Sequence, residues 1–360
     1  MGPMKITETV IQHSLFNSAH SVLGHIMRNI PAGIVVIILG PTQAGKSVVL
    51  EQIYLEMLSE LDQQRVAAEG RKPYVMIQIK STREGRVRMG WLLLRILKAL
   101  DHPMYMHMHE MDECNHYIPT RNRSENAMAL ALDPCIDARQ LEKTIFDEAH
   151  LLTRTDRPDL RGNLLESLKS SHSIQRALIL CSGYELVYKG LFDSPHFAGR
   201  SVFYEFGQYR HTNDDELHEW RRILKAFAAK LPLARETLLD ENADILLRAS
   251  QGVIGLMAKW LWLAKQWSDA NHRAIDLSLL RSTAPPAAEQ LAIAKDIAEG
   301  KHAMVEAGVC ATLGNEVKDG KAVNPAVQKS EDFKPPKKCK PFRAKPKRRS
   351  MNGIEVVELD

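Results

Sequence analysis

The sequence predicts an α/β protein in which a five-stranded parallel sheet is followed by a bundle of helices. Residues 34–39 form an unbroken apolar run rich in β-branched side chains, which is typical of a strand buried on both faces. Four further apolar runs, separated by helical segments, lie at 74–79, at the beginning of 143–150, at 177–181 and at 201–206. From residue 213 only helical patterns remain. Strands that alternate with helices favour a right-handed parallel sheet.

The composition limits the class of protein. The 360 residues are 44% hydrophobic and 26% charged, which are ordinary values for a folded chain of one or two domains. No apolar run approaches the roughly 18 residues that span a bilayer, the N-terminus has no secretion pattern, and the five cysteines include no C-x-x-C pair. We therefore expect a cytoplasmic protein in a reducing compartment, with no membrane partner.

The formal net charge of +4 is unevenly distributed along the chain. Residues 334–349 contain nine Lys or Arg, four Pro and no acid, so the rest of the chain has 39 basic and 44 acidic residues. Any nucleic-acid surface on the folded body must therefore be a local patch. We expect 309–360 to be a disordered basic tail that tethers a partner protein, while its bases add non-specific affinity for DNA. The alternative is a solubilising tail with no partner.

One stretch fits the pattern G-x-x-x-x-G-K-[ST] of a phosphate-binding loop: Gly40-Pro41-Thr42-Gln43-Ala44-Gly45-Lys46-Ser47. Glycines let the backbone turn tightly and gather its N–H groups around the β- and γ-phosphates. Lys46 would add a positive charge there, and the Ser47 hydroxyl could ligate Mg²⁺. The loop follows an apolar strand and precedes a helix, which is the order that this motif requires. The pattern predicts a site for ATP with Mg²⁺.

A second stretch supplies carboxylates at the same edge of the predicted sheet. The third strand ends in Asp147-Glu148, and ligands of open α/β sheets bind at the carboxyl ends of strands. Asp147 is then the Mg²⁺ partner, and Glu148 is the base that polarises the attacking water. Ser182 ends the fourth strand, where it could orient that water or belong to a simple turn.

The expected organisation has four parts. They are an N-terminal helical entry segment (1–30), a nucleotide-binding domain (31–210), a helical lid (211–308) and the basic tail (309–360). Asp133-Pro134 predicts a break within the helix expected at 127–142. Residues 101–126 crowd His, Met and one Cys without a zinc-ligand spacing, so we expect an insertion loop or a partner surface there and no metal other than Mg²⁺.

These features together resemble the AAA+ ATPases: a phosphate loop, a strand ending in Asp-Glu, a polar residue after the next strand, an arginine before the fifth and a helical lid. More narrowly, four stretches resemble the TnsC/TniB regulators of transposition, at 146–152, 165–169, 178–183 and 251–256. The resemblance covers about residues 5–275. It implies an AAA+ P-loop NTPase fold and ATP hydrolysis.

The resemblance also implies partners. Proteins of this family assemble on double-stranded DNA as rings, such as hexamers or heptamers, or as helical filaments, with ATP bound between neighbouring subunits. They link a target-selection protein to transposase subunits, and hydrolysis remodels the assembly. Arg200 is at the position of the arginine that acts in trans on the neighbour's γ-phosphate. The region that faces the DNA corresponds to a loop with four bases: Lys80, Arg83, Arg86 and Arg88. The alternative for Arg200 is a surface arginine with no catalytic role. The alternative for the loop with four bases is a solvated charged loop that does not bind DNA.

Two other classes of protein stay open. One is a different DNA-handling AAA+ machine, such as a replication initiator or a helicase loader. The other is a secretion or signalling ATPase that does not use DNA. Related initiators often carry a nucleotide-sensing arginine in the lid, whereas 252–260 offers only Lys259. Lid sensing by that route is therefore not expected.

Overall fold

The computed structural model describes residues 13–63, 70–81, 85–105, 124–154, 176–188, 200–307, 347–351 and 354–358. The chain divides into two units, 1–316 and 317–360. Within the described ranges, no helix is both long and apolar enough to cross a membrane.

The first unit contains the predicted five-stranded parallel sheet. Its strands are β1 (Val35–Leu39), β2 (Tyr74–Gln78), β3 (Lys143–Asp147), β4 (Ala177–Cys181) and β5 (Ser201–Glu205). Their spatial order is β2-β3-β4-β1-β5, and every pair is parallel. All the carboxyl ends therefore meet at one edge, and β4 alone separates the strand before the phosphate loop from the strand that ends at Asp147. The predicted fold class is confirmed.

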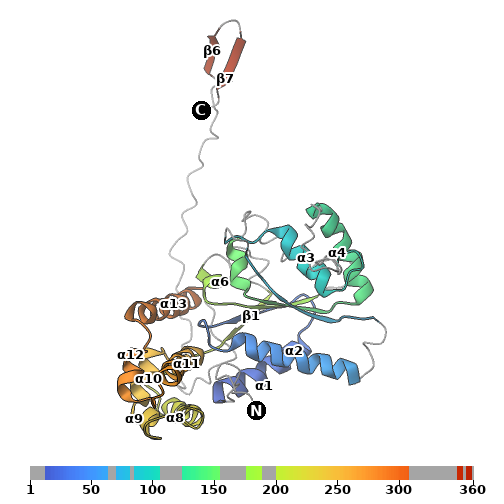
Figure 1. Ribbon diagram of the computed structural model, residues 1–360. Helices are drawn as coiled ribbons and strands as arrows, with labels where there is room; N and C mark the ends of the chain where they lie inside the picture. Colours follow the sequence, from blue (N-terminus) through green and yellow to red (C-terminus); the bar gives the residue numbers. More distant parts are fainter. Residues whose placement is uncertain are drawn as a thin grey trace, which may run out of the picture. The chain divides into compact units, whose positions relative to one another are not determined.

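Different helices cover the two faces of the sheet (Figure 1). Alternate residues of β1 (Val35, Ile37, Leu39) pack in one cluster with α3 (Met89–Ala99) and α4 (Glu125–Arg139). The intervening residues, Val36 and Ile38, pack with α1 (Ser14–Asn29) and α2 (Lys46–Gln63). All five β1 side chains are fully buried, as the unbroken apolar run predicted.

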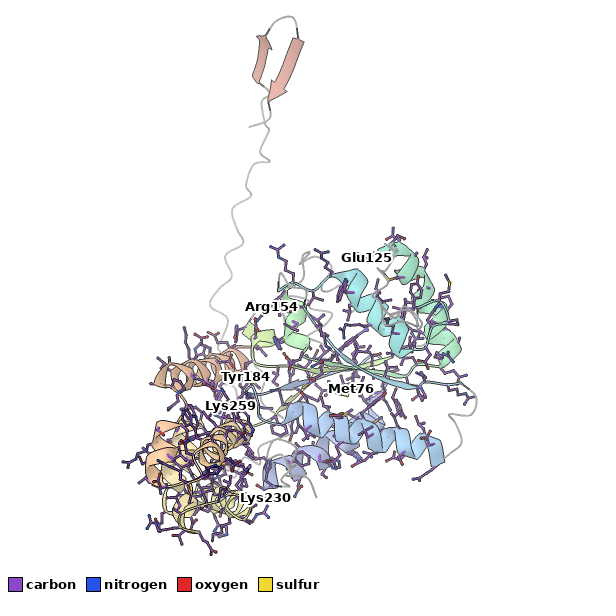
Figure 2. All side chains as sticks on the ribbon, viewed as in Figure 1. Met76, Glu125, Arg154, Tyr184, Lys230 and Lys259 are labelled. Atoms are coloured by element: carbon purple, nitrogen blue, oxygen red, sulfur yellow. The ribbon has the colours of Figure 1, made fainter. Side chains whose placement is uncertain are left out.

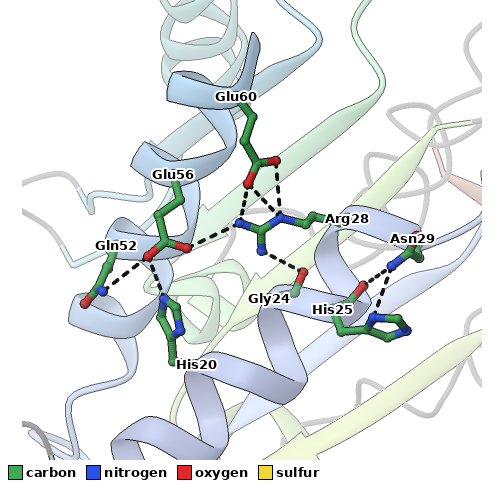
Figure 3. Close-up of polar contacts among 8 residues, drawn as sticks. All are labelled: His20, Gly24, His25, Arg28, Asn29, Gln52, Glu56 and Glu60. Carbon is green, nitrogen blue, oxygen red and sulfur yellow. Dashed lines mark hydrogen bonds and ion pairs between the residues drawn. The ribbon is translucent and has the colours of Figure 1, made fainter. Parts of the chain in front are cut away.

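A polar network joins α1 to α2 (Figure 3). Arg28 of α1 donates hydrogen bonds to both carboxylate oxygens of Glu60, the shortest being 2.7 Å from Nη2 to Oε1. The same Nη2 lies 3.3 Å from Oε2 of Glu56, whose other oxygen is 2.9 Å from His20 Nε2. These contacts hold α1 against α2 on one face of the sheet.

The predicted break at Asp133-Pro134 is wrong, because Pro134 lies inside the continuous helix α4. A proline removes the hydrogen bond to the carbonyl four residues earlier, which belongs here to Leu130. Pro134 is exposed and the side chain of Leu130 is 78% exposed, so water can satisfy that carbonyl.

A helical lid follows the sheet, as the sequence predicted. It comprises α8 (Asp214–Ala228), α9 (Leu238–Glu241), α10 (Ala243–Ala249), α11 (Ile254–Ala270) and α12 (Leu277–Ser282). Its core includes two buried tryptophans, and each indole N–H finds a backbone carbonyl: Trp220 donates to Ala243 at 3.2 Å, and Trp260 donates to Leu280 at 2.9 Å. The last helix, α13 (Ala287–Glu306), returns to the α/β body beside α6 (Glu185–Tyr188) (Figure 1).

The second unit contains a two-stranded antiparallel hairpin, β6 (Lys347–Met351) and β7 (Ile354–Glu358). The register pairs Lys347 with Glu358 and Met351 with Ile354. These two strands lie within the stretch 309–360 for which the sequence predicts disorder, and since 308–346 lie outside the described residues, disorder of the rest of the tail stays a prediction. The sequence signal for the hairpin is Asn-Gly at 352–353, a dipeptide that favours tight hairpin turns.

Candidate nucleotide-binding site

The loop 40–47 joins β1 to α2 at the carboxyl edge of the sheet. Gly40 has a φ of 153°, and a Cβ there would lie 2.4 Å from the Phe206 carbonyl oxygen, so only glycine fits. Gly45 has a φ of 101°, in the region that favours glycine. The Lys46 ammonium closes the loop by donating to the carbonyl oxygens of Gly40 (2.9 Å) and Pro41 (2.6 Å). The phosphate loop therefore has the backbone geometry that its sequence requires.

The structure brings Ser47 and the predicted carboxylate pair together. Ser47 Oγ donates a 3.0 Å hydrogen bond to Asp147 Oδ1, which also accepts from the Glu148 backbone N–H at 2.9 Å. Asp147 is 7% exposed, and the side chain of Glu148 is 43% exposed. The Ser47 hydroxyl and the buried Asp147 carboxylate lie together, and both are oxygen ligands of the kind that Mg²⁺ prefers. These residues therefore fit the magnesium ion that the phosphate loop implies.

Glu148 has an unusual backbone and a polar neighbour. Its φ is 58°, a left-handed conformation that is uncommon for a residue with a side chain. Its Oε2 lies 3.3 Å from Nδ1 of His150, two residues further on. Strained backbone of this kind is concentrated at functional sites, where the surrounding structure holds it in place. The arrangement fits the predicted role of Glu148 as a base that must be precisely aimed.

Burial shapes the electrostatics around the loop. It lowers the pKa of the Lys46 ammonium, and the nearby carboxylates of Glu148 and Asp147 only partly oppose that effect. Burial also raises the pKa of the Cys181 thiol at the end of β4, which therefore stays neutral. A buried ammonium held by two carbonyl oxygens can be stabilised further by an anion, such as a phosphate group.

A cavity of about 560 Å³ extends from the phosphate loop to the lid. This volume falls in the range of sites for small molecules and cofactors. Its lining includes the loop residues 42–47, Asp147, Glu148 and Ser182. Away from the loop the lining is largely apolar, and it comes from α1, α2, α8 and α11: Phe16, Val48, Phe227, Ile254 and Ala258. One charged end and one apolar end suit a ligand that carries phosphates on an aromatic base.

His13 lines the same cavity at the start of α1. Its Nδ1 accepts from the Phe16 backbone N–H at 3.2 Å and lies 3.0 Å from the Tyr209 hydroxyl. The residue is 4% exposed, and burial lowers the pKa of its imidazole to about 4. His13 is therefore neutral at physiological pH, with Nδ1 as an acceptor.

Two glycines allow close backbone contacts in the lid, one with the phosphate loop and one with Tyr209. Gly255, in the first turn of α11, donates its N–H to the Gln43 carbonyl at 3.1 Å, and a Cβ there would lie 2.3 Å from that oxygen. Gly252 has a φ of 67°, and its Cβ would lie 1.9 Å from the Tyr209 carbonyl oxygen. The stretch 251–256, singled out from the sequence, thus provides the close contact between lid and loop.

The other predicted site residues have separate positions. Ser182 is buried at the end of β4, lines the cavity and donates to the Gly183 carbonyl at 2.8 Å. Arg200 is exposed immediately before β5 and does not line the described cavity. Lys80, Arg86 and Arg88 are exposed after β2.

Three further predictions concern the Arg83 and Met/His-rich stretches, Lys259, and metal binding. Arg83 and residues 106–123 of the Met/His-rich stretch lie outside the described residues. Lys259 forms a 2.7 Å ion pair with Glu289 and does not line the described cavity. Among the described residues, no group of three or more His, Cys, Asp or Glu is placed to hold a metal ion.

Sequence reasoning missed several cavity residues: His13, Phe16, Phe227, Ala258 and Asp296. Each comes from a helix that reaches the cavity only through the tertiary fold. The pattern at 251–256 offered a usable signal, because a turn with two glycines marks a close backbone approach.

No protein-family model and no curated protein matches the chain. Among solved structures, it is similar to the ORC1 protein of Aeropyrum pernix in complex with DNA, with a TM-score of 0.53 and 14% identity over 77% of this chain and 66% of that one. It is also similar to the ORC2 protein of Aeropyrum pernix in its ADP form, with a TM-score of 0.50 and 13% identity over 77% of this chain and 71% of that one. At such identities the likeness concerns the fold alone.

The strand order, phosphate loop and helical lid are those of an AAA+ P-loop NTPase fold. The narrower resemblance to the regulators of transposition rests on the sequence.

Proposed function

We propose that this protein is an ATPase that oligomerises on double-stranded DNA and links target-site selection to transposase recruitment. The proposed ATP hydrolysis is supported by the hydrogen bond from Ser47 to Asp147, with Glu148 next in the chain. It joins two motifs a hundred residues apart into a single constellation that also includes the buried Lys46. Such a set is required for phosphoryl transfer from a nucleoside triphosphate to water.

Each residue has a defined task in this reaction. Backbone N–H groups of 42–47 and the Lys46 ammonium bind the β- and γ-phosphates. Ser47 and Asp147 hold the magnesium ion, which when bound offsets the charge of the phosphate oxygens. Glu148 accepts a proton from the attacking water, and Ser182 orients that water. The apolar cavity end, with Phe16 and Ile254, receives the base.

The DNA-associated part has three supports. The sequence resembles regulators that assemble on DNA, and the fold is similar to that of a protein solved in complex with DNA. Lys80, Arg86 and Arg88 also form an exposed basic group on a body that is otherwise acidic. Bases of this kind bind phosphates without reading the sequence, so binding weakens steeply as salt rises.

ATP hydrolysis measured with and without duplex DNA tests this function. We expect the full chain to hydrolyse ATP faster on duplex DNA and Lys46→Ala to be inactive in both conditions. Replacing Lys80 and Arg86 by Ala should weaken binding to unrelated duplexes equally and reduce the slope of log affinity against log salt by about 0.9 per lost phosphate contact. Replacing Lys225 and Lys230 of the lid region is the matched control. Hydrolysis without any response to DNA would favour the secretion or signalling class.

In the proposed assembly, Arg200 acts on the nucleotide site of a neighbouring subunit. Its exposed position before β5 suits a guanidinium that completes the site of a neighbouring subunit. Inactive Arg200→Ala subunits should then regain hydrolysis when mixed with inactive Glu148→Gln subunits, because mixed interfaces contain one intact pair. Absence of rescue in co-assembled mixtures would assign Arg200 a structural role.

A replication initiator is the second candidate, favoured by the similarity in fold to the ORC proteins. A reconstituted integration reaction separates the two candidates. A transposition regulator is required for transposase to use a selected target, whereas an initiator leaves integration unchanged.

A further inference from the structure

Helix α13 follows the lid helices and lies beside the α/β body (Figure 1), and its Asp296 lines the nucleotide cavity. Near its start, Glu289 forms a 2.7 Å ion pair with Lys259 of α11. Further along, Ile297 (6% exposed) and Met304 (3% exposed) are buried in the cluster that covers one face of the sheet. One helix therefore makes contact with both parts that enclose the cavity.

The contact with the α/β body is unusually close at Gly300. A Cβ at this position would lie 2.2 Å from the Tyr184 ring, so a larger residue would separate the two surfaces. Tyr184 is fully buried, and its hydroxyl donates a 2.7 Å hydrogen bond to Glu205 Oε1 at the end of β5. Figure 2 labels Tyr184 beside α13 and Lys259 on the lid. Since Tyr184 follows Ser182-Gly183, α13 is docked at the phosphate end of the site.

Asp296 lies on the docked face of α13 and lines the nucleotide cavity. Its Oδ1 accepts a 3.1 Å hydrogen bond from the Tyr188 hydroxyl of α6. Its negative charge opposes the lowering of the Lys46 pKa, more weakly than the charges of Glu148 and Asp147 do. Glu185 also lines the cavity but forms an ion pair with Arg154. Asp296 thus adds a negative charge, from the C-terminal helix, where phosphates would bind.

We propose that Asp296 is a specificity-determining residue, which disfavours the nucleoside triphosphate relative to the diphosphate while α13 is docked. The γ-phosphate brings additional negative charge next to the Asp296 carboxylate, whereas the diphosphate does not reach as far. Repulsion between the two weakens the docking of α13, so triphosphate binding loosens this helix from the α/β body. The inference rests on the proposed ATPase function.

Equilibrium binding of MgADP and of a non-hydrolysable MgATP analogue to the full chain tests the proposal. We expect Asp296→Asn to tighten binding of the analogue about five-fold or more and to change ADP affinity less than about two-fold. Glu299→Gln is the matched control: it removes one negative charge from the same helix at a side chain that is 53% exposed, and should leave the preference unchanged.

Amide hydrogen exchange across 287–306 supplies a second readout. The analogue should speed exchange in α13 relative to ADP in the wild-type protein, and Asp296→Asn should reduce that difference. An equal effect of the variant on both nucleotides, a weaker affinity for the analogue, or identical exchange with both nucleotides would overturn the inference and leave the ATPase proposal intact. A wild-type chain that binds neither nucleotide would overturn both.

Discussion

Replacing His13 by Gln should make the protein less sensitive to acid. Burial lowers the pKa of this imidazole to about 4, from an ordinary value of 6.5. Because the folded state has the lower pKa, the unfolded chain takes up a proton first as the pH falls. Stability contributed by the neutral, buried ring is complete above about pH 6.5 and is lost progressively down to about pH 4. Gln keeps an acceptor for the Phe16 N–H but carries no titrating group.

The size of the effect follows from the two pKa values. At pH 5 the unfolded imidazole is almost fully protonated, whereas about a tenth of the folded protein is protonated at His13. The free energy of unfolding is then about 2 kcal/mol lower than at pH 7.5 on account of this residue. The Glu219 carboxylate raises the pKa and the Arg222 guanidinium lowers it, but both effects are smaller than that of burial.

Urea unfolding at pH 7.5 and pH 5 measures this difference. The stability of His13→Gln relative to wild type should rise by about 2 kcal/mol between the two conditions. His211→Gln, at an exposed position, is the control and should show no such change. A relative change below about 0.5 kcal/mol for His13→Gln would show that the imidazole is not held neutral in the folded state.

Two further predictions concern a contact beside the cavity and the polar network between α1 and α2. Gly255→Ala should weaken nucleotide binding about ten-fold in a titration, because the new Cβ would lie 2.3 Å from the Gln43 carbonyl oxygen. Gly207→Ala is the control: a Cβ at Gly207 would have no atom within 4 Å, so the affinity should change less than about two-fold. Arg28→Ala should lower the free energy of unfolding by about 0.5–1 kcal/mol through its contacts with Glu60 and Glu56, and a loss that stayed the same in high salt would contradict an ionic origin.

The phosphate end of the site could be predicted from the sequence because local patterns encode it. The loop 40–47 and the pair Asp147-Glu148 each combine an apolar strand with a fixed set of following residues. Parallel strands then bring them to one edge without further information. The structure confirms that Ser47 meets Asp147.

The lid end of the cavity could not be predicted in the same way. His13 pairs with Tyr209 across 196 residues, and Asp296 meets Tyr188 across 108. Neither pair has a spacing that a local pattern can reveal. Gly300 in a helix was a usable signal, since an isolated helical glycine often marks close packing. The break predicted at Pro134 was wrong, because a proline on the exposed side of a helix destabilises it less than a proline that leaves a buried carbonyl unpaired.

The most direct test of the proposed ATPase is to measure nucleotide binding and hydrolysis side by side for Glu148→Gln and Lys46→Ala. Glu148→Gln should bind ATP with near wild-type affinity and hydrolyse it at least about a hundred-fold more slowly, because an amide cannot accept the proton of the attacking water. Lys46→Ala should lose binding, since it removes the buried charge beside the phosphates. Wild-type turnover by Glu148→Gln, or undiminished ATP binding by Lys46→Ala, would contradict the assignment of this site.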